Sequence, residues 1–428
     1  MEPRNALMAG LLLTYIWRFH DLTSGLSALR LAAICTVGSW VYLVLKPRWR
    51  VLGRAVRLPY VSLFLVFSAW GLITAFFALS PEVAFLDWRE AHFKTITMVL
   101  FLISALTTFA LIRLAIVVQT TGAAVLAYFY IKGGFAQWGS PVPMYDRNDM
   151  ALLFNVALPL ILFLVFTAKT RNGRVLVGLV ALAVATSVLM SQSRSGFLTF
   201  GVTVAGTLVI ARGIPLKFRL ALPVLLGLSL FALPSHIQER LSTILEAEED
   251  YNYTSETGRV EIWKRGLGYI NDHKAFGVGW QNFYIAEATI SERARLGTGG
   301  RGQVAHNSFI QVAAETGVPG FILYVGAIVA AIVSLLRLQA RLRRFRGVPL
   351  AHEMSLCAAF LIISIIAFCV GGQFLSMSYH PLLFGQFALA AGLQFSAAGW
   401  EREQQARRFH GPRNRSQMSL SRTTTPVG

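Results

Sequence analysis

The chain has 428 residues, of which 55% are hydrophobic and 14% are charged, and its mean hydropathy is +0.56. One soluble core could not bury so much apolar surface, so this composition excludes a water-soluble globular enzyme. Apolar runs of membrane-spanning length recur along the chain, separated by short charged or Gly/Pro/Ser-containing joints. The sequence therefore predicts an all-α, polytopic membrane protein.

Taken in chain order, the apolar runs predict about twelve transmembrane helices. Their expected ranges are 6–17, 29–45, 58–79, 95–109, 114–131, 150–166, 175–190, 197–211, 220–233, 309–336, 354–375 and 381–398. The predicted organisation is helices 1–9 over residues 1–233, a large hydrophilic loop over 234–306, helices 10–12 over 307–398, and a disordered basic tail over 399–428.

The basic residues decide the expected orientation. With the N-terminus in the cytoplasm, most of the 39 Lys and Arg residues fall in cytoplasmic segments. The positive-inside rule then puts both termini in the cytoplasm and the 234–306 loop in the periplasm. A net charge of +18 could also indicate nucleic-acid binding. The basic residues, however, sit in short loops at the ends of apolar spans, so we expect membrane lipids and no nucleic acid as partners.

Several kinds of chemistry lack their sequence signature. The three cysteines, Cys35, Cys357 and Cys369, lie inside apolar spans without metal-ligand spacing. No Gly-rich phosphate loop, HExxH motif or DxD motif occurs. We therefore expect no cofactor and no metal site.

Arg194 stands in the polar hinge Ser191–Gly196, between two apolar runs that are both short for a full crossing. An arginine at membrane depth costs about 2.5 to 3.5 kcal/mol even on the permissive insertion scale. It is either a loop arginine that reaches the headgroups or a buried anion clamp supported by helix-end amides.

His306 opens the segment in which the long loop becomes a membrane helix, and Glu315 follows inside the apolar part. His306 is either a helix cap or a proton acceptor near neutral pH. Glu315 must be paired or hydrogen-bonded, and its simpler interpretation is a structural partner for a neighbouring arginine or backbone amide.

Within the loop, residues 258–273 predict an amphipathic helix on the membrane surface or over the mouth of the bundle. Its expected apolar stripe comprises Val260, Trp263, Leu267 and Ile270, its expected N-cap is Thr257, and Glu261 and Arg265 are expected to pair. A second amphipathic stretch is predicted over 237–245, and a mobile Gly-rich strip over 297–302.

The order of several motifs resembles that of a known superfamily. The motifs are Ser193-Arg194-Ser195-Gly196, Gly258-Arg259-Val260-Glu261-Ile262-Trp263, Gly277-Val278-Gly279-Trp280-Gln281-Asn282-Phe283, and His306-Asn307 followed by Glu315, Gly317 and Gly320. Together they resemble the O-antigen ligase and polymerase superfamily. The strips Lys132-Gly133-Gly134 and Asp146-Arg147-Asn148-Asp149-Met150 are similar to its exosortase-associated branch.

The resemblance implies a GT-C-like glycosyltransferase of the bacterial inner membrane with a periplasmic active site. The donor would be a saccharide on undecaprenyl diphosphate, and the acceptor a hydroxyl of the lipid A core. The acceptor would instead be a growing glycan for a polymerase, or a protein for an O-oligosaccharyltransferase. A transporter or flippase of a lipid-linked saccharide is the competing class; against it, the two sets of six spans show no repeat.

For the residues, the resemblance implies Arg194 and Arg259 on the donor diphosphate and His306 as general base. Glu315, Arg265, Arg147 and His380 are possible supporting residues. Two guanidiniums would stabilise the departing diphosphate without a metal, and direct displacement would invert the anomeric configuration.

Overall fold

The computed structural model describes residues 2–22, 24–133, 145–231, 258–291, 302–345 and 347–409, together with residues 235, 238 and 255. Across these residues the regular elements are all helical, which confirms the predicted all-α class. Six of the described helices are long and apolar enough to cross a membrane, or seven if the pair Trp49–Ala55 and Pro59–Ala75, bent by 90°, counts as one span. The chain is thus a multi-pass membrane protein, while twelve crossings and a GT-C-like fold stay predictions.

The first part of the chain forms α1 (Pro3–Leu11), η1 (Leu12–Ile16), η2 (Phe19–Asp21), α2 (Ser24–Ala28), α3 (Leu31–Leu45), α4 (Trp49–Ala55), α5 (Pro59–Ala75), α6 (Pro81–Asp87), η3 (Trp88–His92), α7 (Phe93–Ala105), α8 (Phe109–Lys132) and α9 (Arg147–Thr167). The second part forms α10 (Arg171–Met190), α11 (Arg194–Ile210), α12 (Leu216–Phe231), α15 (Arg259–Asp272), α16 (Phe283–Thr289), α18 (Ser308–Leu342), η5 (Arg343–Phe345), α19 (Pro349–Gly371), η6 (Gly372–Phe374) and α20 (Pro381–Phe409). Each of the twelve predicted apolar runs overlaps helical residues; the run 6–17 covers the end of α1 together with η1, and the end of the run 220–233 lies outside the described residues.

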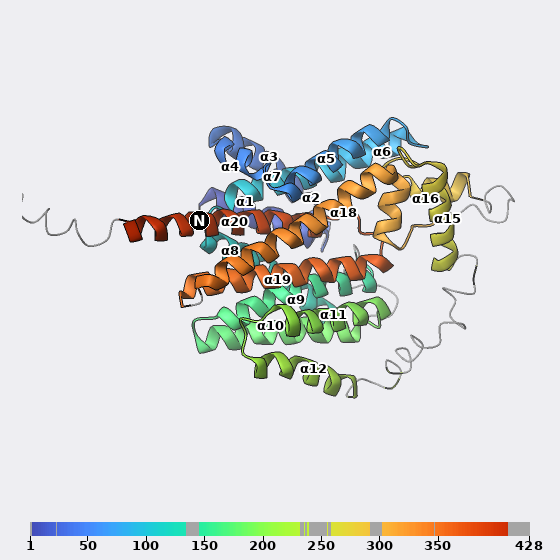
Figure 1. The fold of residues 1–428 in the computed structure, drawn as a ribbon. Coiled ribbons are helices and arrows are strands. Elements are labelled where there is room, and N and C mark those ends of the chain that lie inside the picture. The colour runs from blue at the N-terminus through green and yellow to red at the C-terminus, as the bar shows by residue number, and fades with distance from the viewer. Residues whose placement is uncertain are drawn as a thin grey trace, which may run out of the picture.

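Helices α9 and α19 form the centre of the bundle. In each, 83% of the apolar window is buried, against 22% for α10 at the periphery. Helix α9 packs against α8, α10, α11 and α19, and Ser364 Oγ of α19 donates a hydrogen bond of 2.7 Å to the Val156 carbonyl of α9. The N-terminus and the end of α20 lie at one end of the bundle, whereas α15 and α16 lie at the other (Figure 1). We call the latter the loop end.

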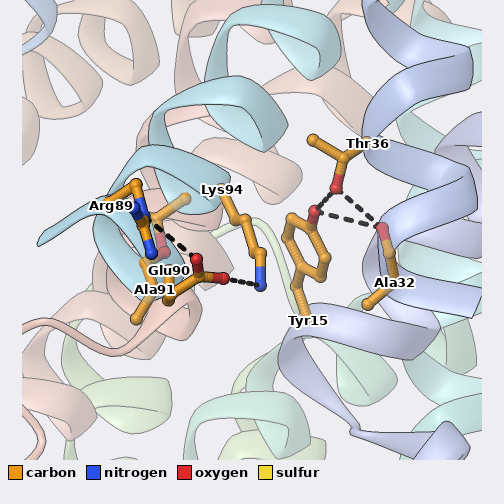
Figure 2. A network of polar contacts seen from close by, with 8 residues as sticks. Tyr15, Ala32, Thr36, Arg89, Glu90, Ala91 and Lys94 are labelled. Carbon is orange, nitrogen blue, oxygen red and sulfur yellow. Dashed lines mark hydrogen bonds and ion pairs between the residues drawn. The ribbon is translucent and has the colours of Figure 1, made fainter. Parts of the chain in front are cut away.

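The N-terminal helices are joined by polar contacts. Tyr15 of η1 hydrogen-bonds to Thr36 and to the Ala32 carbonyl of α3. Figure 2 shows these contacts beside the ion pairs of Glu90 with Arg89 and Lys94. These bonds connect η1 to α3 and support the turn from η3 into α7.

Helix α20 extends past its predicted end at residue 398. Residues 399–409 are helical because Glu, Arg, Gln and Ala are good helix formers, and Arg341 Nε donates to Glu401 Oε1 at 2.8 Å. The prediction of disorder from residue 399 is therefore wrong for 399–409, and the rest of the predicted tail lies outside the described residues.

Helix α18 is broken at Gly317, where φ is 68° and ψ is −177°. Pro319 follows and has no N–H to offer the Glu315 carbonyl one turn earlier. The break also deprives the Ala314 carbonyl of its helical donor, because the Val318 N–H donates instead to the Lys274 carbonyl, at 2.9 Å. The carbonyls of two buried residues thus need partners from elsewhere.

The segment after α15 supplies those partners. The Val278 N–H donates to the Ala314 carbonyl at 2.8 Å, and the Gly279 N–H donates to the Glu315 carbonyl at 3.1 Å. Gly279 has a φ of 101°, and a Cβ there would overlap Ala78. Gly277, whose φ is 69°, approaches the break itself, because a Cβ there would lie 2.5 Å from the Ala314 carbonyl oxygen. The Gly-Val-Gly-Trp motif therefore supplies the N–H groups that the break in α18 requires.

Helix α15 confirms the predicted amphipathic helix but buries a different face. Ile262, Gly266 and Tyr269 are buried, whereas Leu267 of the predicted stripe is 57% exposed. A Cβ at Gly266 would lie 2.6 Å from Ile310 of α18. The predicted stripe is wrong at Leu267, whereas Trp263 and Ile270 are half-buried and Ile270 packs beside Ile262 and Tyr269. The contact face is centred on a glycine, which hydropathy does not register.

The other loop predictions are only partly described. Gly258 is the N-cap of α15, one residue after the predicted Thr257. The stretch 237–245 and the strip 297–302 lie outside the described residues, apart from single positions.

At the loop end, close approaches bring four helices together. A Cβ on Gly196 of α11 would lie 2.7 Å from Ala151 Cβ of α9, and a Cβ on Gly371 of α19 would lie 3.2 Å from Thr199 Oγ1 of α11. The next residue, Gly372, lies against the first residue of α18. The starts of α9, α11 and α18 therefore converge.

Candidate functional site

His306 lies directly before α18 in a left-handed backbone conformation, with a φ of 47°. It is not the helix cap, because Asn307 Oδ1 accepts the N–H groups of Phe309 at 2.9 Å and Ile310 at 3.1 Å. The capping interpretation of His306 is therefore wrong. The His306 N–H donates to Ser376 Oγ at 2.8 Å, which helps to hold a conformation costing about 1–2 kcal/mol.

The loop between α19 and α20 is bonded to the start of α18. Ser308 Oγ donates to the Leu375 carbonyl at 2.7 Å and accepts the Met377 N–H at 3.0 Å. Ser378 Oγ lies 2.8 Å from the Ser308 carbonyl. Sequence reasoning missed this clamp, whose only signal is a run of polar residues between two apolar spans.

Two charged residues act on His306 from other helices. Burial is the main cause that lowers the pKa of His306 below its ordinary value, and the positive charge of Arg259 lowers it further. The negative charge of Asp146 acts in the opposite direction and raises this pKa. Arg259 is the first residue of α15, and Asp146 is the N-cap of α9. Burial and Arg259 thus favour the neutral imidazole, and Asp146 favours its protonated form.

Arg194 is the first residue of α11 and is half-buried. The hinge before it turns through Gln192, whose φ is 56°, and Ser193 Oγ caps the helix by accepting the Gly196 N–H at 3.1 Å. Asn155 of α9 donates to the Gly196 carbonyl at 3.0 Å. The hinge therefore packs against α9, whose N-cap is Asp146. Arg194 thus lies at the same end of the bundle as His306.

Asp146 and Asp149 form a capping box at the start of α9. Asp146 Oδ1 accepts the N–H groups of Asn148 at 2.7 Å and Asp149 at 2.8 Å. Arg147 follows the cap, is half-buried, and makes no ion pair with the residues that the structure describes. Arg147 is thus a third arginine at this end of the bundle.

Glu315 is buried and fully engaged. Tyr379 donates to Glu315 Oε2 at 2.7 Å, and the Phe283 N–H donates to Oε1 at 3.1 Å. Tyr379 also stacks on Trp280 with ring centroids 3.8 Å apart. These contacts favour the structural interpretation of Glu315, with a backbone amide as one partner.

Arg265 makes an ion pair with Glu287 of α16, with NH2 to Oε2 at 2.8 Å, and Tyr269 donates to the same carboxylate at 2.8 Å. Glu261 instead pairs with Lys264 at 2.6 Å, so the predicted pairing of Glu261 with Arg265 is wrong. The pairing failed because the helix turns Arg265 toward α16. Arg265 joins α15 to α16 and supports Arg259 only through that packing.

His380 has both ring nitrogens engaged. Nδ1 accepts the Leu382 N–H at 3.1 Å, so Nε2 carries the proton and donates to Tyr145 at 2.9 Å; Tyr145 donates to the Ile16 carbonyl at 2.9 Å. Burial and the charge of Arg18 lower the pKa of His380 to about 3. Arg18, which lies 5.7 Å from the Tyr145 ring, was not singled out from the sequence because a charge at the end of a span is its only signal.

Comparison with known proteins defines the class. The chain is a polytopic helical membrane protein whose polar breaks and three arginines lie at one end of the bundle. Residues 179–325 match the family model described as O-antigen ligase. The segment contains Arg194, Arg259, His306 and Glu315, so the resemblance to the O-antigen ligase superfamily is confirmed over it. A search of curated proteins found no match. Within the described residues, no three His, Cys, Asp or Glu side chains are grouped as metal ligands.

Proposed function

We propose that the protein is an inverting glycosyltransferase that moves a saccharide from undecaprenyl diphosphate to a hydroxyl of the lipid A core. The observation that carries the proposal is the setting of His306, which is held in a left-handed conformation and whose pKa is affected in opposite directions by Arg259 and Asp146. The O-antigen ligase match over residues 179–325 supports the donor and acceptor classes.

The donor diphosphate is assigned to Arg194 and Arg259. Each is the first residue of a helix, so the positive end of that helix adds to the guanidinium charge. Negative charge grows on the diphosphate as the glycosidic bond breaks, and bidentate guanidinium contacts stabilise it most at that stage. Arg147 is a candidate for further support.

The base is assigned to His306. The acceptor oxygen attacks the anomeric carbon while its proton passes to the neutral imidazole. The bond between the anomeric carbon and the diphosphate oxygen breaks, and the diphosphate leaves with the electron pair. Base and leaving group on opposite faces of the sugar would invert its configuration. Both ring nitrogens of His380 are engaged, which favours His306 over His380.

The chemistry is proposed to be metal-independent and to occur on the periplasmic face of the inner membrane. Two guanidiniums provide the charge stabilisation that a divalent cation supplies elsewhere. Activity should survive EDTA. Loss of activity on chelation, restored by added Mg²⁺ or Mn²⁺, would contradict this part of the proposal.

The test is a transfer assay with purified full-length protein in liposomes. It contains an undecaprenyl-diphosphate oligosaccharide with lipid A core, with a second donor molecule, or with a hydroxyl-bearing peptide. Release of undecaprenyl diphosphate only with lipid A core supports the proposed ligase. Transfer to the second donor or to the peptide would reassign the protein as a polymerase or a protein transferase. Movement of an intact donor across the bilayer would make it a transporter.

A further inference from the structure

A cavity lies at the end of the bundle opposite the loop end. It has a volume of about 330 Å³ and is lined by Arg212, Gly213, Leu342, Arg343, His352 and Ser355. These residues come from the end of α11, the end of α18 and the beginning of α19. Since α11 begins with Arg194 and rises about 1.5 Å per residue over 17 residues, roughly 25 Å separates the cavity from the candidate site.

Two polar side chains of α19 line the cavity without a partner. Ser355 is only 8% exposed, and its Oγ makes no hydrogen bond to any described residue. His352 stands one turn earlier on the same face of the helix, and its ring is also unbonded within the described part of the chain. The Ser355 hydroxyl thus lines the cavity, where it can hydrogen-bond a polar group.

The charge around the cavity is positive. Arg212 Nε is bonded to the Val209 carbonyl at 3.1 Å, which directs its guanidinium at the cavity rim, and Arg343 adds a second guanidinium. The carboxylates of Glu353 on α19 and Glu401 on α20 are engaged with other arginines, since Glu353 binds Arg113 at 2.8 Å and Glu401 binds Arg341 at 2.8 Å.

The beginning of α19 adds to this charge. Its N-cap, Val348, has no side chain that could accept a first-turn N–H, and Pro349 follows at the first helical position. The helix has 23 residues, so its N-terminus carries a partial positive charge beside two arginines.

We propose that this cavity binds a phosphate group, presented by the headgroup of an anionic phospholipid. Arginines, an uncapped helix start and a free hydroxyl are the donors that a phosphate oxygen uses. The lipid source follows from position, because basic pockets between membrane helices near the bilayer surface bind anionic headgroups. Leu216 and Phe218, which begin α12 just after Arg212, are 56% and 48% exposed and offer apolar contact for acyl chains. The proposal does not depend on the proposed transferase activity.

The test uses full-length protein in detergent, titrated with phosphatidylglycerol, phosphatidylcholine or inorganic phosphate. Bound lipid is counted by native mass spectrometry, and the Tm is followed in parallel. Phosphatidylglycerol should bind at least tenfold more tightly than phosphatidylcholine. Arg212→Ala and Arg343→Ala should each weaken its binding by on the order of fivefold. The matched control is Arg344→Ala, which removes an exposed arginine beside the cavity and should leave binding unchanged.

Ser355→Leu fills the cavity without changing its charge and should reduce phosphatidylglycerol binding at least tenfold. This variant also keeps the test valid if an arginine variant fails to fold. Equal binding of the two lipids, or undiminished binding by Ser355→Leu, would overturn the proposal. A Tm increase with inorganic phosphate that also displaces phosphatidylglycerol would assign the site to a soluble phosphate and overturn the lipid source.

Discussion

Replacing His306 with Asn separates its proposed chemical role from its backbone role. The φ of 47° at this position is unfavourable for most side chains, but Asn adopts left-handed conformations more readily. His306→Ala would remove the imidazole and also replace a residue type that is enriched in left-handed conformations by one that is not. His306→Asn removes only the proton acceptor, since its N–H can still donate to Ser376 Oγ.

The expected loss follows from the role of a general base, which contributes roughly 100-fold to 10,000-fold in rate. At about 1.4 kcal/mol per factor of ten, this equals about 3–5.5 kcal/mol of transition-state stabilisation. We expect the Tm of His306→Asn to stay within about 3 °C of the wild type while the transfer rate falls by at least 100-fold.

The assay is single-turnover release of undecaprenyl diphosphate, with donor binding measured separately. The matched control is His273→Asn, which changes a partly buried histidine at the C-cap of α15 and should keep normal activity. Transfer by His306→Asn within tenfold of the wild-type rate would refute the assignment of a general base. Loss of donor binding together with activity would show that His306 binds substrate instead.

Three further predictions concern the charges and the backbone around this residue. Arg194→Lys and Arg259→Lys should each lower kcat/KM at least tenfold, because ammonium lacks the planar bidentate fork; full activity of both would contradict the diphosphate assignment. The acid limb of kcat/KM should lie below pH 6.5, because the pKa of His306 is lowered. Asp146→Asn should move this limb to lower pH, because it removes the negative charge that raises the pKa of His306. Arg259→Gln should move it to higher pH, because it removes a positive charge that lowers this pKa. Shifts of both variants in the same direction would refute the opposite effects of these two charges on His306. Gly279→Ala should destabilise the fold by at least about 2 kcal/mol, because a φ of 101° and the overlap with Ala78 both oppose a Cβ; an unchanged Tm would contradict the tight packing against Ala78.

The sequence predicts the helices and the polar breaks well because the membrane makes hydropathy decisive. Apolar length alone indicates where α9 and α19 run, and the polar residues around Ser193 mark a hinge because a membrane helix rarely carries such a run.

The clamp that the sequence did not predict and the buried face of α15 both depend on contacts between residues distant in sequence. The clamp on α18 joins Ser308 to residues almost 70 positions away, and no local pattern encodes that pairing. Gly266 decides the buried face of α15 through its lack of a side chain, which a count of apolar residues cannot detect. The sequence left a cap open as one of two interpretations of His306, because the position of a cap is uncertain by a residue without backbone angles.

The exchange of hydrogen bonds at the break in α18 makes the segment with Val278 and Gly279 inseparable from the bundle. If this segment were removed, the carbonyls of the buried residues Ala314 and Glu315 would be left unpaired, at a cost of about 1–3 kcal/mol each. Conversely, without this part of α18 the Val278 and Gly279 N–H groups would lose the carbonyls to which they donate. A fragment cut out as an antigen or a soluble domain would therefore not keep this structure. Insertion of the tenth apolar span and folding of the loop must be completed together during biogenesis.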